Sequence, residues 1–229
     1  FEKLKQEDVK NLDSEQSIAF VNAYYRTMDP ELHLRAREVI ERAAERDTEN
    51  GNVWAMVAHI CADEFAFGFN SLPDSLDRAL EASQKAVELE PNSDRTHAAL
   101  AKVYFFRGNI SNALSESEQA LKINPHSATR RFQHGYHLAL SGDWEHGLEL
   151  YKKALVVKTM GAMTWYPVFF DHYRSRRYDD ALKIVHTSGS PRLWMTHACY
   201  AAVHGQMGNA EDSAAALTEL KTQRPEFQN

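Results

Sequence analysis

The sequence predicts an all-α protein, a solenoid of antiparallel helix pairs that stack one after another. Two segments, RALEASQKAVELEP (78–91) and NALSESEQALKINP (112–125), share an Ala-x6-Ala spacing that ends in proline, and they lie 34 residues apart. That distance is the length of one helix–turn–helix repeat. Apolar residues recur at helical spacing in 110–123, and no segment alternates with period two. We therefore expect about six repeats and about twelve helices, without β-strands, in one right-handed superhelical domain over 1–229.

A 34-residue frame that starts at Asp94 brings the rest of the chain into register. Small residues at frame positions 8, 20 and 27 let the two helices of a pair approach closely, while large residues at 4, 7, 11 and 24 fill the space around them. Glycine at position 15 accepts the left-handed conformation that ends the first helix, and proline at 32 ends the second. The frame predicts repeats at 17–50, 51–93, 94–127, 128–161, 162–193 and 194–227.

The first two predicted repeats depart most from the frame. Repeat 17–50 is the weakest and keeps Phe20, Ala36 and Ala43. Repeat 51–93 carries nine extra residues between its helices, in the apolar segment FAFGFNSLP at 65–73. Because surface loops are seldom so apolar unless they pack on something, this insert either folds over its own helix pair or forms a lip on the binding groove.

The later repeats follow the frame more closely. Glycine stands at position 15 in three of them, at Gly108, Gly142 and Gly208, whereas repeat 162–193 runs two residues short. Ser127 and Ser190 lie just before repeats, where N-cap residues belong.

Acidic pairs mark two of the predicted second helices. Asp179-Asp180 and Glu211-Asp212 each stand at a helix start. Carboxylates there complement the positive end of the helix dipole, which we favour over a role in acid–base catalysis. The last predicted helix, roughly 210–222, carries Ala214 to Leu217 and Leu220 with no further helix behind it. Since solenoid ends normally need a polar cap, these residues either all face inward or meet a partner or a second copy.

Composition and motifs argue against several functional classes. The net charge is −6 with mixed sign along the chain, so no basic stripe for nucleic acid is present. No apolar run approaches the roughly 18 residues needed to span a bilayer, which argues against direct membrane insertion. Cys61 and Cys199 are too few for a disulfide framework or a closed zinc site and are expected to be buried. We find no glycine-rich phosphate loop, nucleophile elbow or H-E-x-x-H motif.

The histidines leave one remote alternative open. His134 and His137 lie three residues apart on one predicted helix, close enough to share a metal ion, and His97 stands at position 4 of the preceding repeat. His134 falls at a core position of the frame, which favours a packing role. We therefore predict a protein that is not an enzyme, without catalytic residues, metal or cofactor, and keep a metal-dependent enzyme as the remote alternative.

A candidate binding surface follows from the frame. In a stacked solenoid the first helix of each pair lines the concave face, and positions 2, 5, 9, 12 and 13 point into it. Aromatic residues and arginine contribute most of the binding energy at protein interfaces. About half of the aromatic residues at these positions are expected to pack between helices instead. The predicted peptide-binding residues are Arg95, Lys102, Phe105, Phe106, Phe132, Tyr136, Tyr166, Phe170, Tyr173 and Arg174.

From about 17 to 227 the chain resembles the tetratricopeptide-repeat (TPR) family. The residues that carry the resemblance in repeat 94–127 are Leu100, Ala101, Tyr104, Gly108, Ala113, Ala120 and Pro125. The resemblance implies a scaffold whose concave face binds an extended or helical peptide of another protein. One subgroup of the family holds a C-terminal carboxylate with Lys at position 5 and Asn at position 9 of its first repeat. Here those positions read Ala98 and Lys102, or Phe132 and Tyr136, so that clamp is not carried over.

A narrower resemblance rests on the strings ADEFAFGFN, AKVYFFRGN, SGDWEHGL and RPEF. They look similar to the C-terminal repeat regions of bacterial adenylate-cyclase-like and winged-helix signalling proteins. This implies a sensor or regulatory module of a longer bacterial protein, in the cytoplasm or on the periplasmic side of a membrane-tethered parent. A chain that begins at Phe1 rather than methionine fits such a fragment. Self-association as a homodimer through the C-terminal helix is the alternative function.

Overall fold

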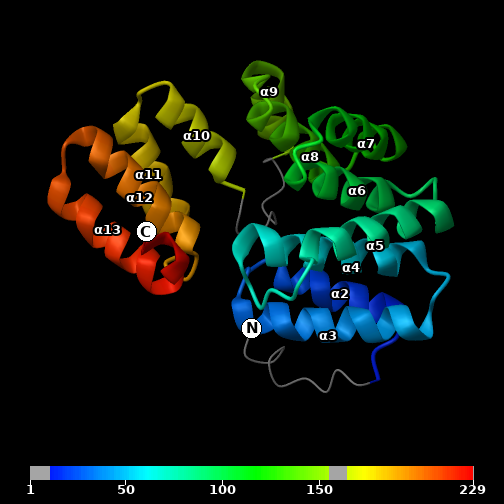
Figure 1. Ribbon diagram of the computed structural model, residues 1–229. Helices are drawn as coiled ribbons and strands as arrows, with labels where there is room; N and C mark the ends of the chain where they lie inside the picture. Colours follow the sequence, from blue (N-terminus) through cyan, green and yellow to red (C-terminus); the bar gives the residue numbers. More distant parts are fainter. Residues whose placement is uncertain (1–10, 155–163, 229) are drawn as a thin grey trace. The chain divides into compact units, whose positions relative to one another are not determined.

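The computed structural model describes residues 11–154 and 164–228, and over these residues the protein is all-helical (Figure 1). Twelve α-helices and one short 3-10 segment account for its regular structure there, and no strand occurs in this part of the chain. The fold is the predicted all-α repeat of helix pairs. The chain divides into two compact units, Phe1–Met160 and Gly161–Asn229, which are described in turn.

The first unit contains four helix pairs (Figure 1). Its helices are α2 (Ser14–Tyr24) with α3 (Pro30–Arg46), α4 (Gly51–Phe67) with α5 (Ser75–Leu89), α6 (Asp94–Phe106) with α7 (Ile110–Ile123), and α8 (Ala128–Leu140) with α9 (Trp144–Ala154). The two helices of each pair contact one another, and the first helices α2, α4, α6 and α8 also contact each other in succession. We call the surface that these four helices share the first-helix face.

The second unit contains two further pairs and a short closing segment. Its elements are α10 (Tyr166–Arg174) with α11 (Tyr178–Ser188), α12 (Trp194–Met207) with α13 (Ala210–Gln223), and the 3-10 segment η1 (Pro225–Gln228). Its core includes Trp165, Tyr166, Phe169, Cys199 and Val203. As predicted, the acidic pairs begin the second helices, since they lie in the first turns of α11 and α13. None of the described helices in either unit is long and apolar enough to cross a membrane.

The turns between paired helices recur with the period of the frame. Gly108, Gly142 and Gly208 adopt φ angles of 74°, 110° and 79°, as expected at the end of a first helix. In repeat 162–193, which has no glycine at frame position 15, Arg176 takes the same place with φ 58°. A side chain in this region costs roughly 1–2 kcal/mol. The turn geometry therefore persists even where the glycine that favours it is missing.

Small residues allow the close approach within a pair, as the frame predicts. A Cβ atom added at Gly147 of α9 would lie 2.5 Å from the backbone nitrogen of Ala139 and 2.6 Å from the carbonyl oxygen of Gly135 on α8. Contacts under 3.0 Å are not tolerated by real Cβ atoms. The predicted importance of small residues at positions 8 and 20 is confirmed for this pair.

One of the two predicted serine caps is wrong. Ser127 caps α8, since its hydroxyl accepts a hydrogen bond from the Arg130 amide at 3.3 Å. Ser190 does not cap α12, which begins only at Trp194. The chain first makes a turn in which the Leu193 amide donates to the Ser190 carbonyl at 3.0 Å. Leu193 is buried, so the helix starts where this side chain can enter the core.

The insert at 65–73 is divided between a helix and a loop. Residues 65–67 complete α4, and Gly68 ends it in the left-handed conformation. Phe67 and Phe69 are buried, and the Phe69 ring lies 5.9 Å from the ring of His33 on α3. The loop thus packs on the preceding helix pair. The ring of Phe65 instead lies 6.2 Å from that of Phe106 on α6, and Phe65 remains 52% exposed.

The C-terminal end is only partly covered. Ala216 and Leu220 of α13 are buried, whereas Leu217 is 41% exposed. The expected set of small residues therefore does not all face inward. Segment η1 follows the helix, and the ring of Phe227 lies 5.5 Å from that of Trp194.

Candidate functional site

A row of aromatic rings runs along the first-helix face of the first unit. Ring centroids are 6.2 Å apart between Phe65 and Phe106, 5.9 Å between Phe106 and Phe105, and 5.8 Å between Phe105 and Tyr136. Phe132 continues the row at 6.1 Å from Tyr136. We call these five residues the aromatic row. Four of them were predicted from the frame, and the structure brings those four together.

The rings of the aromatic row combine packing with exposure. Phe105, Phe106, Phe132 and Tyr136 are half-buried, while Phe65 is more than half exposed. Such rings are held in place by their neighbours yet offer apolar surface to a ligand. Phe65 was not among the predicted residues. The apolar composition of the insert was the sequence signal that could have identified it.

The predicted cations have different surroundings. The ammonium of Lys102 donates hydrogen bonds to the carboxylate of Asp63 and to the carbonyl of His59, and it lies 5.5 Å from the centre of the Tyr25 ring. Its charge is therefore used to join α6 to α4. Arg95 is half-buried on the same helix.

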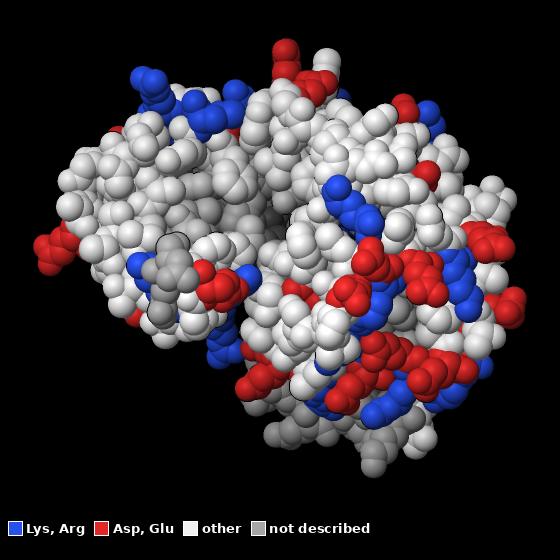
Figure 2. Space-filling view, viewed as in Figure 1, with Lys and Arg blue, Asp and Glu red and all other residues white. Residues whose placement is uncertain are grey.

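The pKa of His59, a buried histidine on this face, is shifted by its surroundings. Burial lowers the pKa of His59 well below its usual range, and the nearby cations Lys102, Arg130 and Arg95 lower it further. Arg130 also pairs with Asp94, with 2.7 Å between Nε and Oδ2. Three cations thus lie near His59, two of them paired with carboxylates, and acidic and basic side chains are intermixed over the surface that Figure 2 shows.

The four binding residues predicted in the second unit differ in how deeply they are buried. Tyr166 is 1% exposed and stacks on Trp165 at 3.9 Å, so it is a core residue, and its predicted contact with a ligand is corrected. Phe170 and Tyr173 are half-buried beside this core. Arg174 is exposed and forms an ion pair with Asp171 at 2.6 Å.

The histidines considered as metal ligands have packing roles. His134 Nδ1 lies 2.8 Å from the Ser117 hydroxyl. His97 contacts the Glu116 carboxylate at 2.6 Å and the Pro91 carbonyl at 2.8 Å. Among the described residues, no group of three His, Cys, Asp or Glu side chains is placed to hold a metal ion.

Both cysteines are buried, as predicted. Burial raises the pKa of Cys61 to about 12 and that of Cys199 to about 12. Because the thiolate is the nucleophilic form, both thiols are unreactive near neutral pH.

His137 gives the first unit a testable response to acid. It is 4% exposed, stacks on Phe105 at 4.8 Å, and burial lowers its pKa to about 3. The unfolded chain protonates this histidine near pH 6.5, so between about pH 6.5 and 3 only the unfolded state takes up the proton. The free energy of unfolding should therefore fall as the pH decreases in this window, by up to about 1.4 kcal/mol per pH unit for this group.

The variant His137→Phe should remove that contribution while keeping the stacked ring. Urea denaturation between pH 6 and 5 is expected to show a slope smaller by about 1 kcal/mol per pH unit than in the wild type. Equal slopes for the two proteins would contradict the assignment of a neutral buried His137.

No protein-family model matches the chain. Over 79 residues it is 33% identical to small glutamine-rich tetratricopeptide repeat-containing protein 2 of Mycosarcoma maydis, a match that covers 34% of this chain and 22% of that protein. Among solved structures, the chain is similar to the APC/C hetero-tetramer Cut9–Hcn1, with a TM-score of 0.68 and 18% identity over 98% of this chain and 42% of that one. The chain spans less than half the length of these two proteins.

A third similarity is to a tetratricopeptide repeat protein from Parabacteroides merdae, with a TM-score of 0.53 and 17% identity. It covers 92% of this chain and 79% of that one. These likenesses concern the fold. None of the three names refers to an adenylate cyclase or a winged-helix regulator, so the narrower resemblance gains no support from them.

Proposed function

We propose that this chain, which has the tetratricopeptide-repeat fold, is a scaffold that holds a protein or peptide ligand on the first-helix face of its first unit. The aromatic row is the observation that carries the proposal. It joins α4, α6 and α8, and its rings pack against one another with centroids 5.8 Å to 6.2 Å apart. Rigid aromatic surface loses little conformational entropy on binding, which makes it efficient in recognition.

The charged side chains near the aromatic row indicate which net charge a ligand should have. Burial lowers the pKa of His59, and the nearby Lys102, Arg130 and Arg95 lower it further, although Lys102 is bound to Asp63 and Arg130 to Asp94. A peptide with apolar side chains and a weak negative charge suits this surface. The aromatic row would contact its side chains, and Arg95 would attract its carboxylates.

Truncation of the row should weaken ligand capture without unfolding the chain. Peptides selected from a random library on the wild-type chain are expected to bind Phe65→Ala and Tyr136→Ala about tenfold more weakly, because large aromatic contacts contribute one or more kcal/mol. Isothermal titration calorimetry with each variant measures the change. Tyr136→Phe keeps the ring and serves as the matched control, with unchanged affinity expected.

Two readouts separate binding from folding. Phe65 is 52% exposed, so its truncation should leave the melting temperature unchanged. Wild-type affinity in both alanine variants, with peptides that still bind the folded chain, would exclude the aromatic row as the binding surface.

We also propose a more specific role for this scaffold and a second candidate function. Service as the sensor or regulatory module of a longer bacterial signalling protein is supported by the short strings named above, and the complete gene product would test it. Self-association through α13 is the second candidate, favoured by the exposed Leu217. Light scattering that shows one concentration-independent monomeric mass would exclude it.

A further inference from the structure

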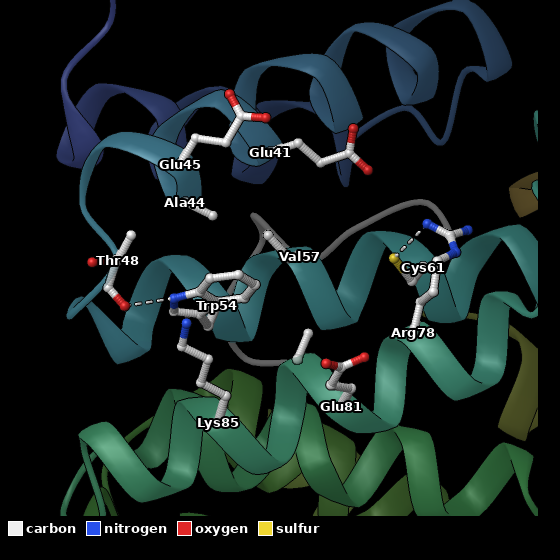
Figure 3. Close-up of a pocket in the computed structure, with 11 residues that line it drawn as sticks. Glu41, Ala44, Glu45, Thr48, Trp54, Val57, Cys61, Arg78, Glu81 and Lys85 are labelled. Atoms are coloured by element: carbon white, nitrogen blue, oxygen red, sulfur yellow. Dashed lines mark hydrogen bonds between the residues drawn. The ribbon is translucent and has the colours of Figure 1, made fainter.

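A pocket of about 590 Å³ opens between the second helices α3 and α5, with α4 as its floor (Figure 3). Ala44 and Ala82 form small walls, while Trp54 and Cys61 come from the floor. Cys61 occupies the frame position at which α6 carries Tyr104, so a thiol stands where another repeat has a ring. The small side chains of Ala44, Ala82 and Cys61 leave this space open. Its volume lies within the roughly 300–1,000 Å³ typical of ligand sites.

The Trp54 ring is fixed and already contacts one cation. Its indole N–H donates to the Thr48 carbonyl at 2.9 Å, which sets the plane of the ring. The Lys85 ammonium lies 3.9 Å from the ring centroid, on the α5 side (Figure 3). The other side of the ring is turned toward α3, where Ala44, Glu41 and Glu45 lie. An aromatic face under carboxylates is a favourable place for a second cation.

Three carboxylates line the pocket, Glu41 and Glu45 from α3 and Glu81 from α5. Within residues 11–154 and 164–228, no hydrogen bond or ion pair engages any of these three side chains. Burial raises the pKa of Glu41, which shows that its carboxylate is partly removed from water without a compensating donor. Arg37 and Arg78 partly offset this rise in the pKa of Glu41, but both guanidiniums are bound to the buried Glu64.

We propose that this pocket binds an arginine side chain from a basic segment of a partner protein. The planar guanidinium would stack on the α3 side of Trp54 and donate to the carboxylates of Glu41 and Glu45, which lie on that side. The aliphatic stem would lie against Ala44 and Val57. Lysine fits less well, since its compact ammonium can lie over a ring but cannot stack as a plane or bind carboxylates bidentately. This site lies on α3, α4 and α5 and does not depend on the aromatic row.

The peptide acetyl-Gly-Arg-Gly-amide tests the proposal in the full chain. Its matched control replaces arginine with citrulline, which keeps the shape and removes the charge. Nitrogen-15 NMR should show a saturable shift of the Trp54 indole signal with the arginine peptide and none with the citrulline peptide. The Trp54→Phe variant assigns the signal. Absence of a saturable indole shift, or an equal shift with both peptides, would overturn the proposal.

Variants separate this pocket from general charge attraction. The double variant Glu41→Gln, Glu45→Gln should lower the affinity for the arginine peptide about tenfold, since two charged hydrogen bonds are weakened. Glu88→Gln neutralises an exposed carboxylate of α5 outside the pocket and should have no effect. Lys85→Ala, which removes the competing cation, should tighten binding roughly threefold. Equal losses in the double variant and in Glu88→Gln would overturn the proposal.

Discussion

Replacing Glu64 with alanine is expected to lower the free energy of unfolding by about 3 kcal/mol. The substitution removes the buried carboxylate with which two arginines form ion pairs. Glu64 lies on α4 and is completely buried. Arg37 of α3 donates to its Oε1 at 3.0 Å, Arg78 of α5 donates to its Oε2, and the Leu72 amide of the insert donates to Oε2 at 3.2 Å. One carboxylate thus joins three helices and a loop.

Urea denaturation measures this loss, and the chain offers a matched control. Glu38 on α3 forms an exposed pair with Arg42 at 3.9 Å. Because exposed pairs contribute little, Glu38→Ala should cost less than about 0.5 kcal/mol. Similar small losses in Glu64→Ala and Glu38→Ala would show that the buried carboxylate does not hold the helices together.

The second large effect concerns the crossing of α8 and α9. Gly147→Ala is expected to lower the free energy of unfolding by about 2 kcal/mol, in the range found for overpacked cores. The new methyl group would meet backbone atoms of Ala139 and Gly135, which cannot rotate away, so the two helices would have to separate. This loss should outweigh the gain of roughly 1 kcal/mol that alanine normally brings to a helix interior.

Gly205→Ala is the control for that substitution. Gly205 also lies inside a helix, α12, but the nearest atom to an added methyl group is Ser213 Oγ at 3.6 Å. The change should therefore raise the free energy of unfolding by about 0.5 kcal/mol. Thermal or urea denaturation compares the two variants. Effects of the same sign would mean that close helix approach does not explain Gly147.

Much of the fold could be predicted because the repeat has local causes. The 34-residue spacing of small residues and turn glycines sets which faces meet, and the structure keeps the same turn at Arg176, where glycine is missing. Ser190 was misplaced because the start of α12 depends on the burial of Leu193, a tertiary effect that a capping pattern does not contain.

The candidate site was less predictable, because partners come from distant parts of the chain. The frame placed Lys102 on the correct helix, but its bond to Asp63, 39 residues away, depends on how two repeats pack. Tyr166 follows the same pattern, since its burial against Trp165 arises within the core of the second unit. The pocket over Trp54 was not predicted at all. Its lining comes from three helices, and only their packing brings it together.

The hydrogen bonds of Glu64 affect where the chain can be shortened without breaking a cooperative unit. Stacked repeats often fray from an end, one unit at a time. Here Arg37 binds both Glu64 and the Asn70 carbonyl, and the Asn70 amide donates to the Pro30 carbonyl. The first two helix pairs are thus cross-linked by their side chains and should open as one cooperative block. A shortened version that begins at residue 94 would remove this block as a whole, whereas one that begins at 51 would remove Arg37 and leave the buried carboxylate of Glu64 without one of its two arginines.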